Sequence, residues 1–303
     1  MPDVMPAAPE PVVHVPVVHV PAAPESEAPV LVLGGTGTTG SRVAELLRGR
    51  GVPVRVASRH PRVDGGGDQV WFEWSAPAGH AAALAGVRRL YLVAPVGEAD
   101  PLALVEPFLA AALAQGLRRV VLLSSSAVPE GAPVLGQVHR LVRTTVPEWT
   151  VLRPSWFMQN FVGDHPVAAG IRDAGEIVTA TGAGRVSFVD AGDIASVAVA
   201  ALLDEPAHNT EHLITGPAAL SYAEAAALIT EATGRPVRHR NVGVPEFTAR
   251  ITAAGYPPDF AAVLAALDDD IRRGTQEQVS PTVARLTGRP PRSFEDFVTA
   301  HFR

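Results

Sequence analysis

The feature that most constrains this chain is the stretch LVLGGTGTTGSRVAELLRGRG, residues 31–51, in which an apolar run meets glycines and then an amphipathic helical pattern. Gly34, Gly37 and Gly40 stand at the junction in the spacing G-x-x-G-x-x-G. Glycine tolerates positive φ and lets a ligand approach the backbone, while free N–H groups at a helix N-terminus attract an anion. A plain turn is the alternative. Strand, glycine turn and helix in this order predict a dinucleotide-binding site.

The same alternation of apolar runs and helical patterns continues along the chain. Continuous apolar runs are typical of strands that are buried on both faces. They lie at residues 30–34, 53–58, 69–74, 89–94, 118–124 and 149–153, and the helical patterns lie near 41–50, 78–86, 101–116 and 134–146. This order predicts an α/β fold with a Rossmann-like, doubly wound parallel sheet.

The pattern becomes less regular after Arg153. We expect a strand at 185–190, a helix at 191–205 capped by Asp193, a strand at 211–216, a helix opened by the capping box SYAE at 221–224, and a solvated helix end at the DDD of 268–270. These segments predict a small, mostly helical C-terminal substrate subdomain beside the carboxyl edge of the sheet.

These patterns divide the chain into three parts. The first 28 residues alternate proline with small or β-branched residues, which predicts a disordered tail. The predicted parts are a Pro-rich tail at 1–28, an NAD(P)-binding Rossmann domain at 29–162 and 186–215, and a substrate subdomain at 163–185 and 216–303.

Composition excludes several classes of function. The chain has a formal net charge of −6 and no cysteine, and all 25 of its basic residues are arginine, so it has no lysine. We therefore expect no nucleic-acid partner, no disulfide and no lysine Schiff base. The longest apolar run, 194–203, is too short to span a bilayer, which predicts no membrane partner and a cytoplasmic protein. His208 and His212 lack an evident third ligand, so no metal is expected. The oligomeric state stays open.

The end of the second predicted strand indicates which dinucleotide is bound. NAD-binding proteins of this kind usually carry an acidic residue about 20 residues after the glycine turn, where it holds the ribose diol. Here Ser58 and Arg59 take that place. A guanidinium group complements a 2′-phosphate, so the sequence favours NADP(H) over NAD(H). A solvated strand-end residue is the alternative for Arg59.

Five segments in order carry a resemblance to a known family. They are the glycine stretch at 31–51, VVLLSSSAV, TVLRPSWFMQNF, RVSFVDAGDIASVA and LITGPAALSYAEAAALI. Together they resemble the NmrA-like atypical short-chain dehydrogenase/reductase family, and in particular its ergot-alkaloid branch with festuclavine dehydrogenase. The likeness runs over most of residues 29–240. It implies a nicotinamide near the loops after Ser124 and Pro154 and a small-molecule pocket roofed by the C-terminal part.

The resemblance also implies roles for individual residues. The implied dinucleotide contacts are Gly34, Thr36, Gly37, Thr38, Thr39, Gly40, Ser58, Arg59, Pro95, Ser124 and Pro154. The residues after the sixth strand lie at the carboxyl edge, where α/β sheets place ligands, and would line the substrate pocket. These are Trp156, Phe157, Met158, Asn160 and Phe161. The packed start of a helix is the alternative for this group.

The chain lacks the catalytic residues that are usual in the wider superfamily. Ordinary members use a tyrosine and, four residues later, a lysine on the helix before the sixth strand. Here the helix predicted at 134–146 has no tyrosine, and the chain has no lysine. Two substitutes are candidate catalytic residues. His139 shares a helix face with Arg143, and Ser125 follows the fifth strand, with Ser126 as its neighbouring alternative. A packed histidine is the alternative for His139.

The absence of the tyrosine–lysine pair restricts which chemical groups of a substrate can accept the hydride. A ketone becomes an alkoxide that must be protonated, whereas an iminium becomes a neutral amine and requires positioning more than acid catalysis. We expect an NADPH-dependent reductase of a small apolar imine or iminium, in secondary metabolism. The alternatives are a non-catalytic NAD(P)-sensing regulator of the NmrA type, and a quinone or carbonyl reductase or non-redox rearrangement enzyme on the same fold.

Overall fold

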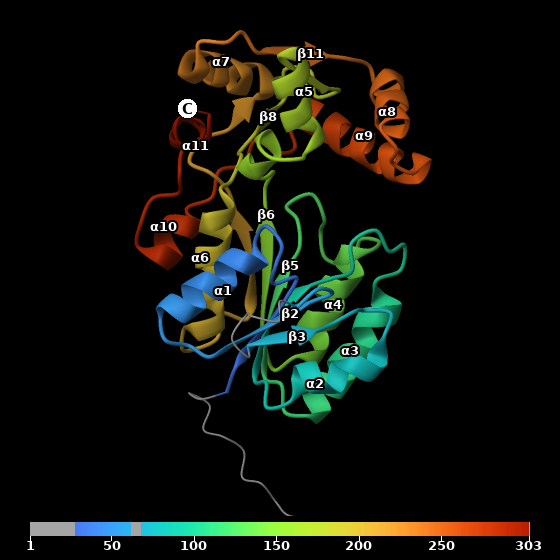
Figure 1. The fold of residues 1–303 in the computed structure, drawn as a ribbon, viewed down its shortest axis with the longest axis vertical. Helices are drawn as coiled ribbons and strands as arrows, with labels where there is room; N and C mark the ends of the chain where they lie inside the picture. The colour runs from blue at the N-terminus through green and yellow to red at the C-terminus, as the bar shows by residue number, and fades with distance from the viewer. Residues whose placement is uncertain (1–27, 62–67, 303) are drawn as a thin grey trace, which may run out of the picture.

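The structure is a computed structural model that describes residues 28–61 and 68–302 (Figure 1). The tail predicted at 1–28 lies outside the described residues except for Ala28. Among the helices of the described ranges, none combines the length and the apolarity that crossing a membrane requires.

Seven parallel strands form the central sheet, in the order β3-β2-β1-β4-β5-β6-β9. They are β1 Val30–Leu33, β2 Val54–Ser58, β3 Gln69–Trp71, β4 Arg89–Val93, β5 Arg119–Leu123, β6 Glu148–Pro154 and β9 Thr210–Ile214. The chain starts in the middle of the sheet at β1, runs outward to β3 and then crosses to β4 on the other side of β1. The reversal lies between β1 and β4, and sheets of this kind bind ligands at the carboxyl ends of such strands.

Helices cover both faces of the sheet, as the sequence predicts (Figure 1). One face carries α1 Gly40–Gly49, α6 Ala191–Leu203 and α10 Thr282–Thr287, and the other carries α2 His80–Leu84, α3 Leu102–Ala114 and α4 Leu135–Thr145. Side chains of β1 alternate between the two cores, with Val32 on the α1 and α6 side and Leu31 on the α3 and α4 side. Because both sides of the strand are covered, its sequence is apolar throughout.

The smaller subdomain lies over the carboxyl edge of the sheet (Figure 1). Two short strand pairs organise it: β7 with β11 in parallel and β8 with β10 in antiparallel order. Its elements are α5 Pro166–Ala174, β7 Glu176–Thr179, β8 Arg185–Val186, β10 Leu220–Ser221, α7 Tyr222–Thr233, β11 Arg238–Asn241, α8 Val244–Ala253, α9 Pro258–Arg272 and α11 Phe294–His301. Neither β7 nor β11 is predicted from the sequence; each has four residues, and β11 is largely polar.

The predicted N-terminal cap is confirmed for one helix and is wrong for another. Ser221 and Glu224 form the predicted capping box of α7. The expected cap of α6 was wrong by three residues, because Asp190 is the N-cap and its carboxylate accepts a hydrogen bond from Gly192 N. Asp193 instead lies buried in the first turn, where it accepts a hydrogen bond from the Arg292 backbone. It thereby joins α6 to the segment that precedes α11.

Candidate active site

The glycine turn between β1 and α1 is compact and open to solvent. Gly34 has a φ of +61°, and its carbonyl accepts a hydrogen bond from Gly37 N at 2.9 Å. A Cβ atom added at Gly40 would meet Gly34 O at 2.3 Å, so the helix can start this close only with glycine. Gly34, Thr36, Gly37 and Thr38 are exposed. The free N–H groups that start α1 are therefore next to accessible backbone, as a bound diphosphate requires.

Tyr91 supports this turn from below. It is fully buried on β4, and its hydroxyl donates to Thr39 Oγ1 at 2.9 Å. Burial raises the pKa of the Tyr91 hydroxyl well above its usual range. One of the three tyrosines of the chain is thus an anchor of the glycine turn.

The other residues expected to contact the dinucleotide also lie along the carboxyl edge. Ser58 ends β2, Ser124 follows β5, and both hydroxyl oxygens are buried without a hydrogen-bond partner in the part of the chain that the structure describes. Arg59, which follows Ser58, is exposed and forms no hydrogen bond or ion pair with another described residue. Pro95 follows β4 and Pro154 ends β6. Buried hydroxyls without a partner, together with an exposed guanidinium that pairs with no described residue, fit a polar ligand that lies along this edge. Their roles stay predictions.

Ser125 lies in a loop that is held in place from two sides. Its Oγ accepts a hydrogen bond from Ala127 N at 3.3 Å, and its carbonyl accepts one from the Arg153 guanidinium. The neighbouring Ser126 Oγ donates to Gln276 Oε1 at 3.2 Å, which joins this loop to the segment after α9. Ser125 is half-buried at the predicted nicotinamide position, and its catalytic role stays a prediction.

His139 lies on the buried face of α4. It is 1% exposed, its ring centre is 6.4 Å from that of Trp149, and its Nε2 is 3.9 Å from Glu211 Oε2. Burial lowers the pKa of His139, against the opposing pull of Glu211. Arg143, expected to orient a ligand beside it, pairs instead with Glu130 at 2.8 Å. These surroundings are typical of a packed histidine rather than of an acid in contact with substrate. The catalytic role of His139 stays a prediction.

A cavity of about 400 Å³ lies in the subdomain, among α5, β7, α7, α8 and α9. Its aromatic wall consists of Trp156, Tyr222, Phe247, Tyr256 and Phe260. Of the five residues expected to line the pocket, Trp156 and Asn160 line this cavity. Met158 is fully buried in the subdomain core, and Phe157 packs against the core on the α1 and α6 side. His139 is not part of the cavity wall.

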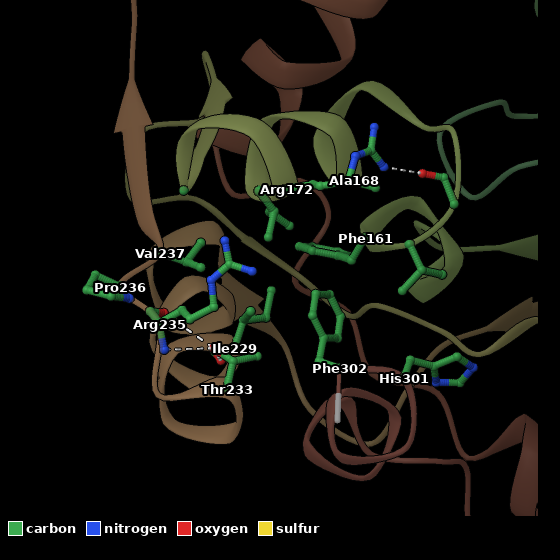
Figure 2. A pocket seen from close by; sticks show the side chains of 14 residues that line it. Phe161, Ala168, Arg172, Ile229, Thr233, Arg235, Pro236, Val237, His301 and Phe302 are labelled. Carbon is green, nitrogen blue, oxygen red and sulfur yellow. Dashed lines mark hydrogen bonds between the residues drawn. The ribbon is translucent and has the colours of Figure 1, made fainter.

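A second cavity, of about 290 Å³, lies between α5, α7 and α11 (Figure 2). Figure 2 shows Phe161, Ile229 and Phe302 around it, with Arg235 at its rim. The ring of Phe161 stacks on that of Tyr222 with centroids 5.9 Å apart. Since Tyr222 lines the first cavity, this aromatic pair separates the two spaces.

Asp268 corrects the expectation of a solvated helix end. It is 7% exposed, and its Oδ2 accepts a hydrogen bond from Ala180 N at 2.7 Å. Burial raises the pKa of its carboxyl group from 3.8 to about 6, against the effect of that hydrogen bond. The helical spacing of Ala261, Ala265, Asp268 and Ile271, all buried on α9, was the signal that could have placed it on the inner face.

His208 and His212, for which the sequence predicts no metal, contact each other. His208 Nδ1 and His212 Nε2 share a hydrogen bond of 2.9 Å, and His208 Nε2 lies 3.2 Å from Asp204 Oδ2. Burial, followed by the charge of His208, lowers the pKa of His212 to about 4.

Proteins with related sequences match the chain over most of its length. The uncharacterized oxidoreductase YesF of Bacillus subtilis (strain 168) is 47% identical over 274 residues, which cover 90% of this chain and 95% of YesF. Festuclavine synthase II of Penicillium roqueforti (strain FM164) is 39% identical, with 88% of this chain and 96% of that protein covered. The chain belongs to the NmrA-like atypical short-chain dehydrogenase/reductase family.

This NmrA-like protein is an oxidoreductase, as the sequence predicts. Its fold also matches the NADPH-dependent quinone oxidoreductase QOR2 from Escherichia coli complexed with NADPH, with a TM-score of 0.77 and 23% identity. That match covers 90% of this chain and 100% of the other, and it concerns the fold alone. No protein-family model matches the chain. The predicted family and the Rossmann-like fold are confirmed.

Proposed function

We propose that the protein is an NADPH-dependent reductase that delivers hydride to a small, largely apolar imine or iminium without a Tyr–Lys pair. The observation that carries this proposal is the position of the aromatic cavity. Trp156 and Asn160, which line it, follow directly on β6 at the sheet edge that also carries the exposed glycine turn. A relative named festuclavine synthase II supports this substrate class.

The residues of the carboxyl edge fit a dinucleotide phosphate. The backbone N–H groups at the start of α1 would hold the diphosphate, and Gly40 lets this helix start close against the backbone of Gly34. Arg59 would hold the 2′-phosphate, because it is exposed, unpaired among the described residues and has no carboxylate next to it in sequence. Ser58 and Ser124 would donate their unsatisfied hydroxyls.

The side chains around the cavity favour positioning over acid catalysis. A bound reduced nicotinamide supplies the hydride. The chain has no lysine, Tyr91 is bonded to Thr39, and burial raises the pKa of Tyr222 far above neutrality. The Tyr–Lys pair that protonates an alkoxide in the ordinary superfamily is therefore absent from this chain. An iminium requires no such proton, so Trp156 and its aromatic neighbours need only orient a flat ring and exclude water.

The test is to titrate the purified full chain with NADPH and NADH, and then to follow NADPH consumption with three acceptors. These are 2-methyl-3,4-dihydroisoquinolinium as the iminium, menadione as the quinone and cyclohexenone as the enone. We expect tighter binding of NADPH and consumption with the iminium. Tight binding without consumption by any acceptor would indicate the sensing regulator, and consumption with menadione alone would indicate a quinone reductase.

A pair of tryptophan variants examines the cavity itself. Trp156→Ala should raise KM for the iminium by about tenfold or more, because an aromatic wall is lost. Trp71→Ala is the matched control, since Trp71 is 45% exposed on β3 at the outer side of the sheet. Equal effects of the two variants on KM would contradict a substrate role for the cavity.

A further inference from the structure

We propose that Asp268 is the counter-ion for a positively charged nitrogen of the substrate, bound in the aromatic cavity of the subdomain. The inference rests on the proposed function and specifies the charge that its substrate carries. It assigns to Asp268 a role in binding, separate from the transfer of hydride at the sheet edge.

The first support is a buried carboxylate without a cationic partner. Asp268 lines the cavity and is 7% exposed. Its described neighbours provide one hydrogen bond, from Ala180 N to Oδ2, and no ion pair. Removing a carboxylate from water is costly unless a charge or several donors compensate for it. A cationic ligand next to the second oxygen would supply that compensation.

The second support is the charge balance of the cavity. Titratable groups reach this space from every element around it: His165 before α5, Glu176 on β7, Tyr222 on α7, Arg250 on α8, Tyr256 between α8 and α9, and His239 of β11 behind Tyr222. Burial lowers the pKa of both histidines, which are therefore neutral at pH 7. Two carboxylates then face one guanidinium, that of Arg250, which is exposed. The excess negative charge disfavours anionic ligands and favours a cation.

The third support is the group of aromatic side chains that share the cavity with the carboxylate. Aromatic faces attract cations, and the effect grows when water is excluded. Tyr256 and Phe260 stack with ring centroids 5.7 Å apart, and Tyr222 is 5% exposed with its hydroxyl unbonded within the described ranges. The Asp268 charge also influences Tyr222, whose pKa it helps to raise. A carboxylate, a free hydroxyl and stacked rings around one space match a ring-bearing ammonium or iminium.

The experiment compares a cation with a neutral molecule of the same shape. The probes are 2-methyl-3,4-dihydroisoquinolinium, whose charge does not depend on pH, and 3-methyl-1,2-dihydronaphthalene, which has no charge. Calorimetric binding to the full chain is measured with NADP⁺, so that no reduction occurs. Asp268→Asn should weaken binding of the cation by about tenfold or more, as for the loss of a charge-assisted contact, and leave the neutral probe unchanged.

Two controls separate a charge effect from a structural one. Asp270→Asn changes the same residue type on α9, where Asp270 is 42% exposed and pairs with Arg273, and it should alter neither affinity. In the unaltered protein the affinity for the cation should fall as the pH drops through about 6, where the Asp268 carboxyl takes up a proton. This second measurement can be made even if Asp268→Asn does not fold.

The inference fails if Asp268→Asn weakens both probes equally, which would make Asp268 only an anchor for Ala180. It also fails if the affinity of the unaltered protein for the cation is constant from about pH 5 to about pH 8. Reduction assays keep the two proposals apart. Asp268-dependent binding of an iminium that NADPH never reduces would overturn the proposed function alone. Iminium reduction with the same kcat/KM in Asp268→Asn would overturn the counter-ion role alone.

Discussion

The glycine turn at the sheet edge and the aromatic cavity above it are built from different parts of the chain. The turn is a continuous stretch, residues 34–40, whose geometry depends on backbone contacts such as that between Gly37 N and Gly34 O. The cavity collects side chains from α5, β7, α7, α8 and α9, which lie far apart in sequence. The first site recognises a ligand mainly through main-chain groups, and the second through side-chain shape and charge.

The two sites therefore tolerate substitutions differently. A backbone site depends on the absence of side chains, so adding a single carbon atom can close it. A side-chain cavity is defined by the groups that it presents, so removing a charge changes which ligand fits while the fold persists. The following variants test each half of this comparison.

Gly40→Ala should have the largest effect. Its Cβ would lie 2.3 Å from Gly34 O, so the turn or the helix start must move. We expect a loss of about 1–3 kcal/mol in the free energy of unfolding and roughly 100-fold weaker NADPH binding. Denaturant unfolding and coenzyme titration measure both. Gly49→Ala, at the other end of α1, meets nothing within 4 Å and should be neutral or slightly stabilising. Full NADPH affinity in Gly40→Ala would refute the backbone site.

Arg59→Asp should weaken NADPH binding by about 30–100-fold and NADH binding by less than about threefold, because only NADPH carries the 2′-phosphate. Arg50→Asp is the control, with the same change of charge at an exposed position past the far end of α1. Fluorescence titration with both coenzymes gives the ratio. An equal loss for NADPH and NADH would remove the 2′-phosphate role from Arg59.

Asp268→Asn should stabilise the protein at pH 8 by about 1–3 kcal/mol, since one pKa unit corresponds to about 1.4 kcal/mol. The folded pKa is raised from 3.8 to about 6, so the folded protein holds the proton more tightly. The stability contributed by this group is therefore present below about pH 4 and is lost as the pH rises to about 6. Asn can still accept the Ala180 hydrogen bond. Thermal unfolding between these pH values should lose this slope in the variant but keep it in Asp270→Asn.

His139→Gln should have the smallest effect, with kcat changed by less than about twofold and a stability loss of about 1 kcal/mol. Burial lowers the His139 pKa, so the unfolded chain binds the proton more readily below 6.5. Stability of the unaltered protein should fall as the pH drops below that value, and the variant should lose this dependence. A kcat loss of several orders of magnitude at unchanged stability would instead restore His139 as the catalytic acid.

The sequence predicted the sheet and its flanking helices closely, because buried parallel strands are apolar throughout and their helices have a clear period. The predictions from the sequence were wrong at individual residues. Asp268 belongs to a DDD run that looks solvated, yet its helical spacing places it inward. Met158 and Phe161 follow Trp156 within five residues, but both side chains are buried in the subdomain core and neither lines the cavity that Trp156 lines. The sequence does not predict the β7 and β11 pair, because strands of four residues carry little periodicity.

The sequence alone determined the family, the Rossmann-like sheet, the glycine turn and the absence of lysine, because each depends on local spacing or on composition. Only the tertiary structure decided that His139 is buried, that Tyr91 supports Thr39, and that a carboxylate and a ring of aromatic side chains share one cavity. Those contacts join segments up to about a hundred residues apart, and no local period in the chain encodes which distant side chains will meet.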